Sequence, residues 1–433
     1  MTEHYATSDR RPVRPAGSPT EGAEGVTAFA ETLFGHLPRA DQRRWARLYL
    51  RGLLTAPGRK SVRHLAAAVC ASPTASQSLH QFLNASPWDW APVRSELLGW
   101  TERRTTVRAL SIGTAILPKR GEHSCGVHRR FVPALGRTVN CQVGLGVFVS
   151  SEDGDIPVDW RLLLPRQWDE DERLRERARI PRGVRKVPLW SHAVSLIEDV
   201  APWGERLPVV AELGDCLEAG PLAIVLDRRG HDFVIAVPPD LRVLPADGDL
   251  GLPVAARRGA MPSREAVPAL ALLHRRGRAP LPVHQRGTAR PRSGGTRSDR
   301  GSDRTRWALA RLPGSHHVFR LFTEVHPAEG PYPRVWISNL LDRPTGHLLD
   351  LARRHHGTGL ALDRLERDFG MLDFEGRSYP GWHHHMTLIS AAYAYGLLSG
   401  ARERTREEAR ERTREEARER TREEARERTR EPV

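Results

Sequence analysis

Cysteine is scarce in this 433-residue sequence, and long apolar runs are absent. The four cysteines lie far apart, with no Cys-x-x-Cys pair. This spacing excludes a disulfide framework and a zinc site of recognisable pattern, and isolated thiols are typical of a reducing cytoplasm. No run of eighteen apolar residues occurs, and the first residues contain no apolar signal segment. We therefore expect a soluble cytoplasmic protein without membrane contact.

Negative charge is also in short supply. The formal net charge is +14 and the sequence pI is about 10.5. The excess is concentrated between Gly251 and Ala310, where thirteen arginines face three acidic residues, a balance of +10. An excess of this sign and size favours a polyanionic partner, and DNA is the first hypothesis.

The order of patterns along the chain indicates the fold class. Helical spacing of apolar residues begins at about Val26, and β-rich runs begin at Val107 with "VRALSIGTAIL", "TVNCQVGLGVFVS" and "IPVDWRLLL". Helical and strand-like segments then alternate. Three strands followed by this alternation predict an α/β fold, a mixed sheet with helices on its faces.

Two segments fall outside that pattern. Residues 251–305 are rich in Arg, Gly, Pro and Ser and predict a flexible insertion. The octapeptide ARERTREE begins at Ala401, Ala409 and Ala417, and it has no apolar face, so it predicts a solvated helix or a disordered tail. The expected parts are a disordered segment 1–25, a helical DNA-binding domain 26–104, a core in two parts 105–250 and 306–400, the insertion 251–305, and the charged tail 401–433.

Several stretches resemble the insertion-sequence 701-type transposases of the DDE superfamily. These are "RWARLYLRGLL" (44–54), "LPKRGEHSCGVHRRFVPALGRTVNCQVG" (117–144), "IPVDWRLLLPRQWDEDERLRERARIP" (156–181) and "FEGRSYPGWHHHMTL" (374–388). Their order and spacing make coincidence a poor explanation. The resemblance implies an RNase H-like catalytic domain, transposition by DNA strand cleavage and transfer, and DNA as partner, and it leaves a homo-oligomer open.

The resemblance also implies a metal site of two aspartates and one glutamate. Such a triad holds two Mg²⁺ or Mn²⁺ ions, which activate a nucleophile and stabilise the leaving oxygen. The first aspartate position falls on Gly113 or Thr114, neither of which is acidic, and the second falls on Glu212.

The remaining ligand positions are less well defined. Asp215 lies close behind Glu212 in sequence, and the late-helix glutamate corresponds best to Glu366, which has Asp363 and Asp368 as neighbours. We expect Glu212 and Glu366 to be catalytic, and Glu212, Asp215 and Glu366 to be the metal ligands if the protein is active. With one ligand missing and one altered, the sequence predicts that catalysis is lost or impaired.

Other residues carry two interpretations each. Glu212 can simply end a strand, and Glu366 lies in a charged run that is typical of a solvated helix face. Asp159 can replace a lost carboxylate, but beside Trp160 in a strand a structural role is favoured. The consecutive histidines His383–His385 cannot all face one ion from a helix, because successive side chains point about 100° apart, so a structural or phosphate-facing role is favoured.

A group of basic residues is expected on the active face. They are Lys119, Arg120, His128, Arg129 and Arg130. Lys and Arg neutralise phosphates without reading the base sequence, so this group predicts nucleic-acid binding, with a solvated basic loop as the alternative. The competing hypotheses for the whole chain are a non-catalytic DNA-binding protein recruited from a transposase and an RNase H-like nuclease.

Overall fold

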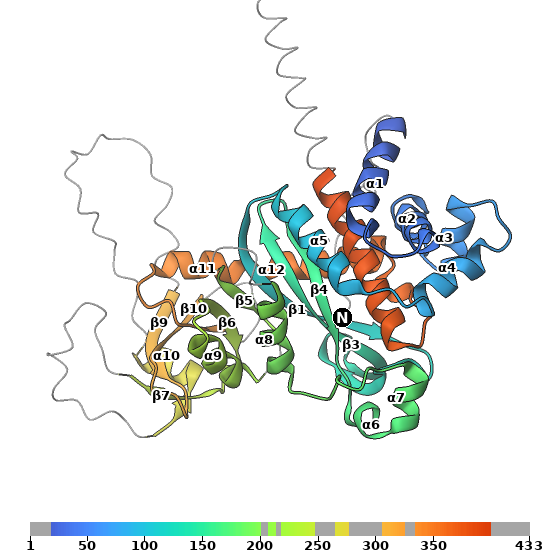
Figure 1. Ribbon diagram of the computed structural model, residues 1–433. Helices are drawn as coiled ribbons and strands as arrows, with labels where there is room; N and C mark the ends of the chain where they lie inside the picture. The colour runs from blue at the N-terminus through green and yellow to red at the C-terminus, as the bar shows by residue number, and fades with distance from the viewer. Residues whose placement is uncertain are drawn as a thin grey trace, which may run out of the picture.

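The computed structural model describes residues 19–200, 207–213, 218–246, 265–276, 305–324 and 334–399. The chain begins with a group of five helices (Figure 1): α1 (Pro19–Phe34), α2 (Ala40–Thr55), α3 (Val62–Val69), α4 (Ala75–Asn84) and α5 (Trp90–Glu102). Helix α3 is capped by the Ser61 side chain, which accepts from the backbone N–H of His64, and α5 is capped by Asp89, which accepts from Ala91. Within the described residues, no helix combines the length and apolar character needed to cross a membrane.

A mixed sheet forms the centre of the molecule. Strands β1 (Val107–Pro118), β3 (Arg137–Ser151) and β4 (Asp155–Leu162) form an antiparallel meander, whereas β5 (Val209–Ala211) is parallel to β1 and β6 (Phe233–Val237) is parallel to β5. The resulting order β4–β3–β1–β5–β6 is the strand order of an RNase H-like core. The predicted α/β fold class is therefore confirmed.

Six further strands belong to the sheet outside that core. Strand β2 (His128–Val132) pairs with the first residues of β3. On the other side, β6 is followed in the sheet by β11 (Val335–Ser338), β10 (Phe319–Glu324), β9 (Thr305–Arg311), β7 (Arg242–Pro245) and β8 (Val267–Pro268). All eleven strands thus belong to one sheet among the described residues.

Helices cover both faces of this sheet (Figure 1). Helices α8 (Leu189–Val200) and α9 (Ala219–Arg228) lie on one face, and α11 (Thr345–Arg353) and α12 (His355–Asp368) lie on the other. Strand β3 is buried on both sides from Cys141 to Ser151 for this reason. The smaller helices α6 (Arg166–Glu170) and α7 (Glu172–Ala178) lie near the end of the sheet where β3 begins.

The last described helix, residues 379–399, joins the N-terminal helices to the sheet (Figure 1). Tyr395 lies 5.2 Å from Phe29 and 6.4 Å from Trp100 between ring centroids. On the sheet side, Trp382 is fully buried over Gly144, where an added Cβ would lie 2.8 Å from the indole. The two ends of the described chain therefore share one hydrophobic core.

Some segment boundaries differ from the sequence expectation. Helix α1 begins at Pro19, ahead of the apolar pattern that starts at Val26, so part of the segment expected to be disordered is helical. Within the expected flexible insertion, residues 265–276 form β8 and α10 (Ala269–Arg276), because Leu272 and Leu273 are buried. The rest of the insertion up to residue 304 and the octapeptide tail lie outside the described residues.

Candidate functional site

Glu212 follows β5 directly, at the centre of the sheet. The strand register places Ile112 opposite Ala211, so Glu212 lies one step further on the face that α12 covers. One carboxylate oxygen (Oε1) lies 3.2 Å from Arg334 Nε, and the other (Oε2) lies 2.7 Å from His355 Nε2. Both oxygens of the predicted catalytic carboxylate therefore have partners within the protein.

The charge on Glu212 is stabilised by these partners. Burial raises the pKa of its carboxyl, but the hydrogen bond from His355 and the charges of His355 and Arg334 together lower it by more. The pKa therefore lies below its ordinary value, and the carboxylate stays ionised at neutral pH. Its negative charge is already balanced by groups of the chain itself.

Gly113 lies next to this position on β1 and leaves no room for a carboxylate. A Cβ built on Gly113 would lie 2.5 Å from Cγ2 of Thr358 on α12 and 3.3 Å from the Phe148 ring. The close packing of α12 on β1 thus depends on the absence of a side chain here.

A buried polar cluster that the sequence did not indicate lies on the same face. The Thr358 hydroxyl lies 2.7 Å from the Ser111 hydroxyl and 2.7 Å from Oδ2 of Asp155. Burial raises the pKa of Asp155, against the opposing effect of the Thr358 and Ser150 hydrogen bonds and the charge of Arg354. In the sequence, Asp155 follows Gly154 and is typical of a turn, so its burial follows only from the docking of α12.

A comparison of the chain with known families identifies the family. Residues 32–307 match the family described as DDE superfamily endonuclease. The chain belongs to this family.

This DDE family member was also compared with solved structures and with curated protein sequences. A cryo-EM structure of piggyBac transposase in a synaptic complex with hairpin DNA is similar to it, with 13% sequence identity and a TM-score of 0.42, covering 88% of this chain and 72% of that one. No curated protein sequence matches it.

DDE endonucleases use divalent metal ions, which require several ligand side chains around one point. No group of three His, Cys, Asp or Glu side chains within the described ranges is placed to hold a metal. Glu366 is exposed on α12, eleven residues after His355, which places it about 16 Å away along the helix axis. Glu366 therefore does not join Glu212, and Asp215 lies outside the described residues.

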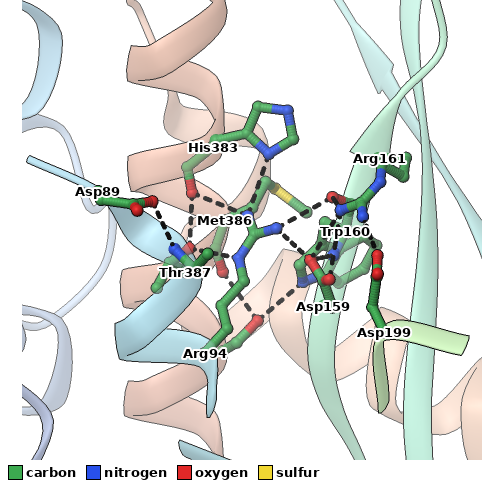
Figure 2. Close-up of polar contacts among 11 residues, drawn as sticks. Asp89, Arg94, Asp159, Trp160, Arg161, Asp199, His383, Met386 and Thr387 are labelled. Carbon is green, nitrogen blue, oxygen red and sulfur yellow. Dashed lines mark hydrogen bonds and ion pairs between the residues drawn. The ribbon is translucent and has the colours of Figure 1, made fainter. Parts of the chain in front are cut away.

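Asp159, the considered replacement carboxylate, belongs to a different cluster (Figure 2). It forms an ion pair with the buried Arg94 of α5 and lies 3.2 Å from Arg161, which in turn contacts Asp199 on α8. Arg94 also donates to the Trp160 carbonyl oxygen at 3.0 Å. Because β4 is an edge strand, this donor satisfies a carbonyl that has no partner strand. These contacts fit the structural interpretation of Asp159.

The three consecutive histidines are buried and point to different partners. His383 Nδ1 lies 3.1 Å from Arg94, and the ring stacks on Trp90. His384 stacks on Trp88 at 3.8 Å between centroids, and His385 stacks on Phe374. Their rings fill separate positions in the core, which fits the structural role favoured from the sequence.

The five predicted basic residues divide into two groups. Lys119 is half-buried, donates to the Phe374 carbonyl oxygen at 2.6 Å, and has its pKa lowered to about 8 by burial. Arg120 and Arg129 are exposed, whereas His128 and Arg130 are half-buried on the inner face of β2. The exposed pair is better placed than Lys119 to contact phosphates, and the predicted nucleic-acid role of all five stays a prediction.

Proposed function

We propose that this chain is a DNA-binding protein derived from an insertion-sequence 701-type transposase and that its ancestral DNA strand cleavage is lost. The observation that supports this proposal is the state of Glu212. Its two oxygens are taken by Arg334 and His355. Gly113, one of the two positions expected for the first aspartate, lies under Thr358 with no room for a side chain.

The physical argument concerns what a divalent cation requires. Mg²⁺ needs hard oxygen ligands with negative charge in near-octahedral geometry, and two-metal catalysis needs several such groups around one point. The described residues do not fit this requirement, because Arg334 and His355 already occupy both oxygens of Glu212 and no group of three His, Cys, Asp or Glu side chains among these residues is placed to hold a metal. We therefore derive no catalytic step through a metal.

DNA binding is the part of the ancestral function that we propose to be retained. The net charge of +14 attracts phosphates through counterion release, and we assign the main contacts to the N-terminal helices and the exposed Arg120 and Arg129. We propose that this activity takes place in the cytoplasm.

A titration with Mn²⁺ tests the loss of the metal site. We expect the full-length protein to bind no Mn²⁺ in a calorimetric titration, and the Glu212→Gln variant to behave identically. Cleavage of element-end DNA in Mg²⁺ or Mn²⁺ is expected to be absent in the wild type, Glu212→Gln and Glu366→Gln. Saturable Mn²⁺ binding that disappears in Glu212→Gln would overturn the proposed loss.

DNA binding is measured separately, by fluorescence anisotropy with a labelled duplex at several salt concentrations. We expect the affinity to fall steeply and linearly in a plot of log K against log salt. A protein that binds neither duplex nor single-stranded DNA at low salt would refute the proposed function.

A further inference from the structure

The β2–β3 hairpin exposes apolar side chains in a way that the core does not explain. Phe131 on β2 is 57% exposed and Leu135 in the turn after it is 49% exposed. Phe131 is the only aromatic residue among the exposed large hydrophobic side chains in the described ranges. An exposed aromatic ring costs solvation free energy, so its position invites a binding role.

Exposed arginines surround this hairpin. Arg129 is two residues before Phe131 and lies on the same exposed face of β2, because successive side chains in a strand alternate. Arg137, the first residue of β3, pairs with Val132 and is also exposed. Neither Arg129 nor Arg137 has an ion-pair partner among the described residues.

Helices α6 and α7 extend the basic surface. The side chains of Gln167 and Trp168 both donate to the Val127 carbonyl oxygen at 2.9 Å, which fixes α6 beside the start of β2. The next exposed cations along the chain, which likewise have no ion pair within the described ranges, are Arg173, Arg177, Arg179 and Arg182. Of these, Arg179 donates to the Ser378 hydroxyl at 3.1 Å.

The nearby acidic residues do not cancel this charge. Asp169 faces Arg175 and Arg185, and Glu170 pairs with Arg166. The acidic side chains of α6 are therefore largely engaged, whereas Glu172 and Glu176 of α7 are exposed beside Arg173 and Arg177. Over residues 166–186 eight basic residues face five acidic ones, a surplus of +3.

An exposed ring flanked by cations matches the chemistry of a single-stranded polynucleotide. Phosphates attract the arginines, and an unpaired base has a free π-face on which an aromatic side chain can stack. In an intact duplex the bases are stacked on each other, so Phe131 has no free face to contact. A second copy of this chain is a poor occupant, because two such patches would bring like charges together.

We propose that the β2–β3 hairpin and α7 bind DNA with unpaired bases, with Phe131 stacking on a base and Arg129 contacting the backbone phosphates. This inference rests on the proposed DNA-binding function and adds to it the preference for unpaired bases and the residue that provides it.

The first test compares single-stranded and duplex DNA with the full-length protein by fluorescence anisotropy. Phe131→Ala is expected to weaken single-strand binding by about fivefold or more and duplex binding by less than about twofold. Phe131→Trp keeps an aromatic ring and is expected to restore the single-strand affinity. Leu360→Ala removes an equally exposed side chain on α12 and is expected to change neither affinity.

The second test separates stacking from charge. Arg129→Gln is expected to lower the slope of log K against log salt for single strands by about 0.7, whereas Phe131→Ala leaves the slope unchanged. Arg242→Gln, an exposed arginine on β7 far along the sheet, is the matched control and leaves the slope unchanged.

The outcomes distinguish this inference from the function on which it rests. If the wild type binds neither form of DNA, the proposed function fails. If the wild type binds DNA but Phe131→Ala weakens single strand and duplex equally or not at all, only the hairpin inference fails. It also fails if Phe131→Ala changes the elution volume in size-exclusion chromatography and leaves DNA binding intact, because Phe131 would then be a protein contact.

Discussion

A single buried side chain, Arg94, connects three parts of the chain. Its guanidinium donates to Thr387 Oγ1 at 2.7 Å on the helix of residues 379–399, and to the Trp160 carbonyl oxygen at 3.0 Å on β4, in addition to its ion pair with Asp159 (Figure 2). Burial lowers the pKa of Arg94, and the charge of Asp159 opposes this effect. A buried cation with this many acceptors is costly to remove, because the acceptors lose their donors while they stay buried.

Arg94→Met is therefore expected to lower the free energy of unfolding by about 3–5 kcal/mol, the range for breaking a buried ion pair from one side. Arg108→Met is the control, since the Arg108–Glu152 pair is solvent-exposed and a surface ion pair contributes much less to stability than a buried one. Urea unfolding followed by tryptophan fluorescence gives both values. Equal losses in the two variants would contradict the role assigned to Arg94.

The buried histidines make stability depend on pH. Burial lowers the pKa of His384 to about 4, although its two carbonyl partners favour the charged ring, and lowers the pKa of His385 to about 3. Below pH 6.5 the unfolded chain therefore binds protons that the folded chain does not. Stability present above pH 6.5 is lost as the pH falls towards these folded values.

His385→Phe is expected to flatten this pH dependence, because phenylalanine keeps the stacking on Phe374 and cannot be protonated. The wild type should lose about 2–3 kcal/mol more than this variant between pH 6.5 and 4.5, at about 1.4 kcal/mol per pH unit for one histidine. Urea midpoints at several pH values measure this difference. His80→Gln, a change at an exposed histidine, should leave the wild-type profile unchanged, and an unaltered profile in His385→Phe would rule the explanation out.

At the level of elements, the packing of α12 on β1 determines what the central site can hold. The methyl group of Thr358 occupies the space above Gly113, while its hydroxyl contacts Ser111 and Asp155. A side chain at position 113 would therefore compete with the Thr358 methyl group for the same space. Moving α12 away from β1 would expose the buried Asp155. A clash between a side chain at position 113 and Thr358 is therefore expected to lower the free energy of unfolding.

We expect Gly113→Ala to destabilise the protein by about 1–3 kcal/mol through overpacking. Thr358→Ser removes the methyl group and keeps the hydroxyl, so the double variant should recover part of the loss. A double-mutant cycle measured by urea unfolding gives the coupling directly. Additive effects of the two substitutions would show that Thr358 is not the group that excludes a side chain at 113.

The sequence predicts the elements with strong periodicity and misses those that depend on the sheet edge. The expected alternation of helices and strands after the first three strands is present, and the three β-rich runs are β1, β3 and β4, because apolar runs bounded by turn residues are local signals. Strands β2, β7, β8 and β9 were not predicted, since β2 is a basic five-residue edge strand and β8 has only two residues.

At the candidate site too, the sequence predicts what depends on neighbouring residues and misses what depends on residues far away in the chain. The position of Glu212 at the end of an apolar strand can be predicted from the local sequence, while its catalytic role stays a prediction. Its partners Arg334 and His355 are more than a hundred residues away in sequence, and only the docking of β11 and α12 brings them to it. The burial of Asp155 could not be predicted from the sequence for the same reason.

For the whole molecule, the distribution of charge bears on the proposed DNA binding. Residues 277–304 lie outside the described structure, and their sequence contains seven arginines and two acidic residues. Charge in such a segment is expected to act through phosphate neutralisation, which depends on the number of cations and little on their order.

Replacing residues 277–304 with a Gly/Ser linker of equal length is therefore expected to reduce the slope of log K against log salt for duplex DNA, with no change in the melting temperature. A variant with the same residues in scrambled order keeps the charge and should keep the slope, because counterion release does not read sequence. Anisotropy titrations at a series of salt concentrations compare the three proteins. A slope that falls as much in the scrambled variant as in the linker variant would indicate that this segment makes sequence-specific contacts. An unchanged slope in the linker variant would assign the phosphate contacts to the folded surfaces, the β2–β3 hairpin first among them.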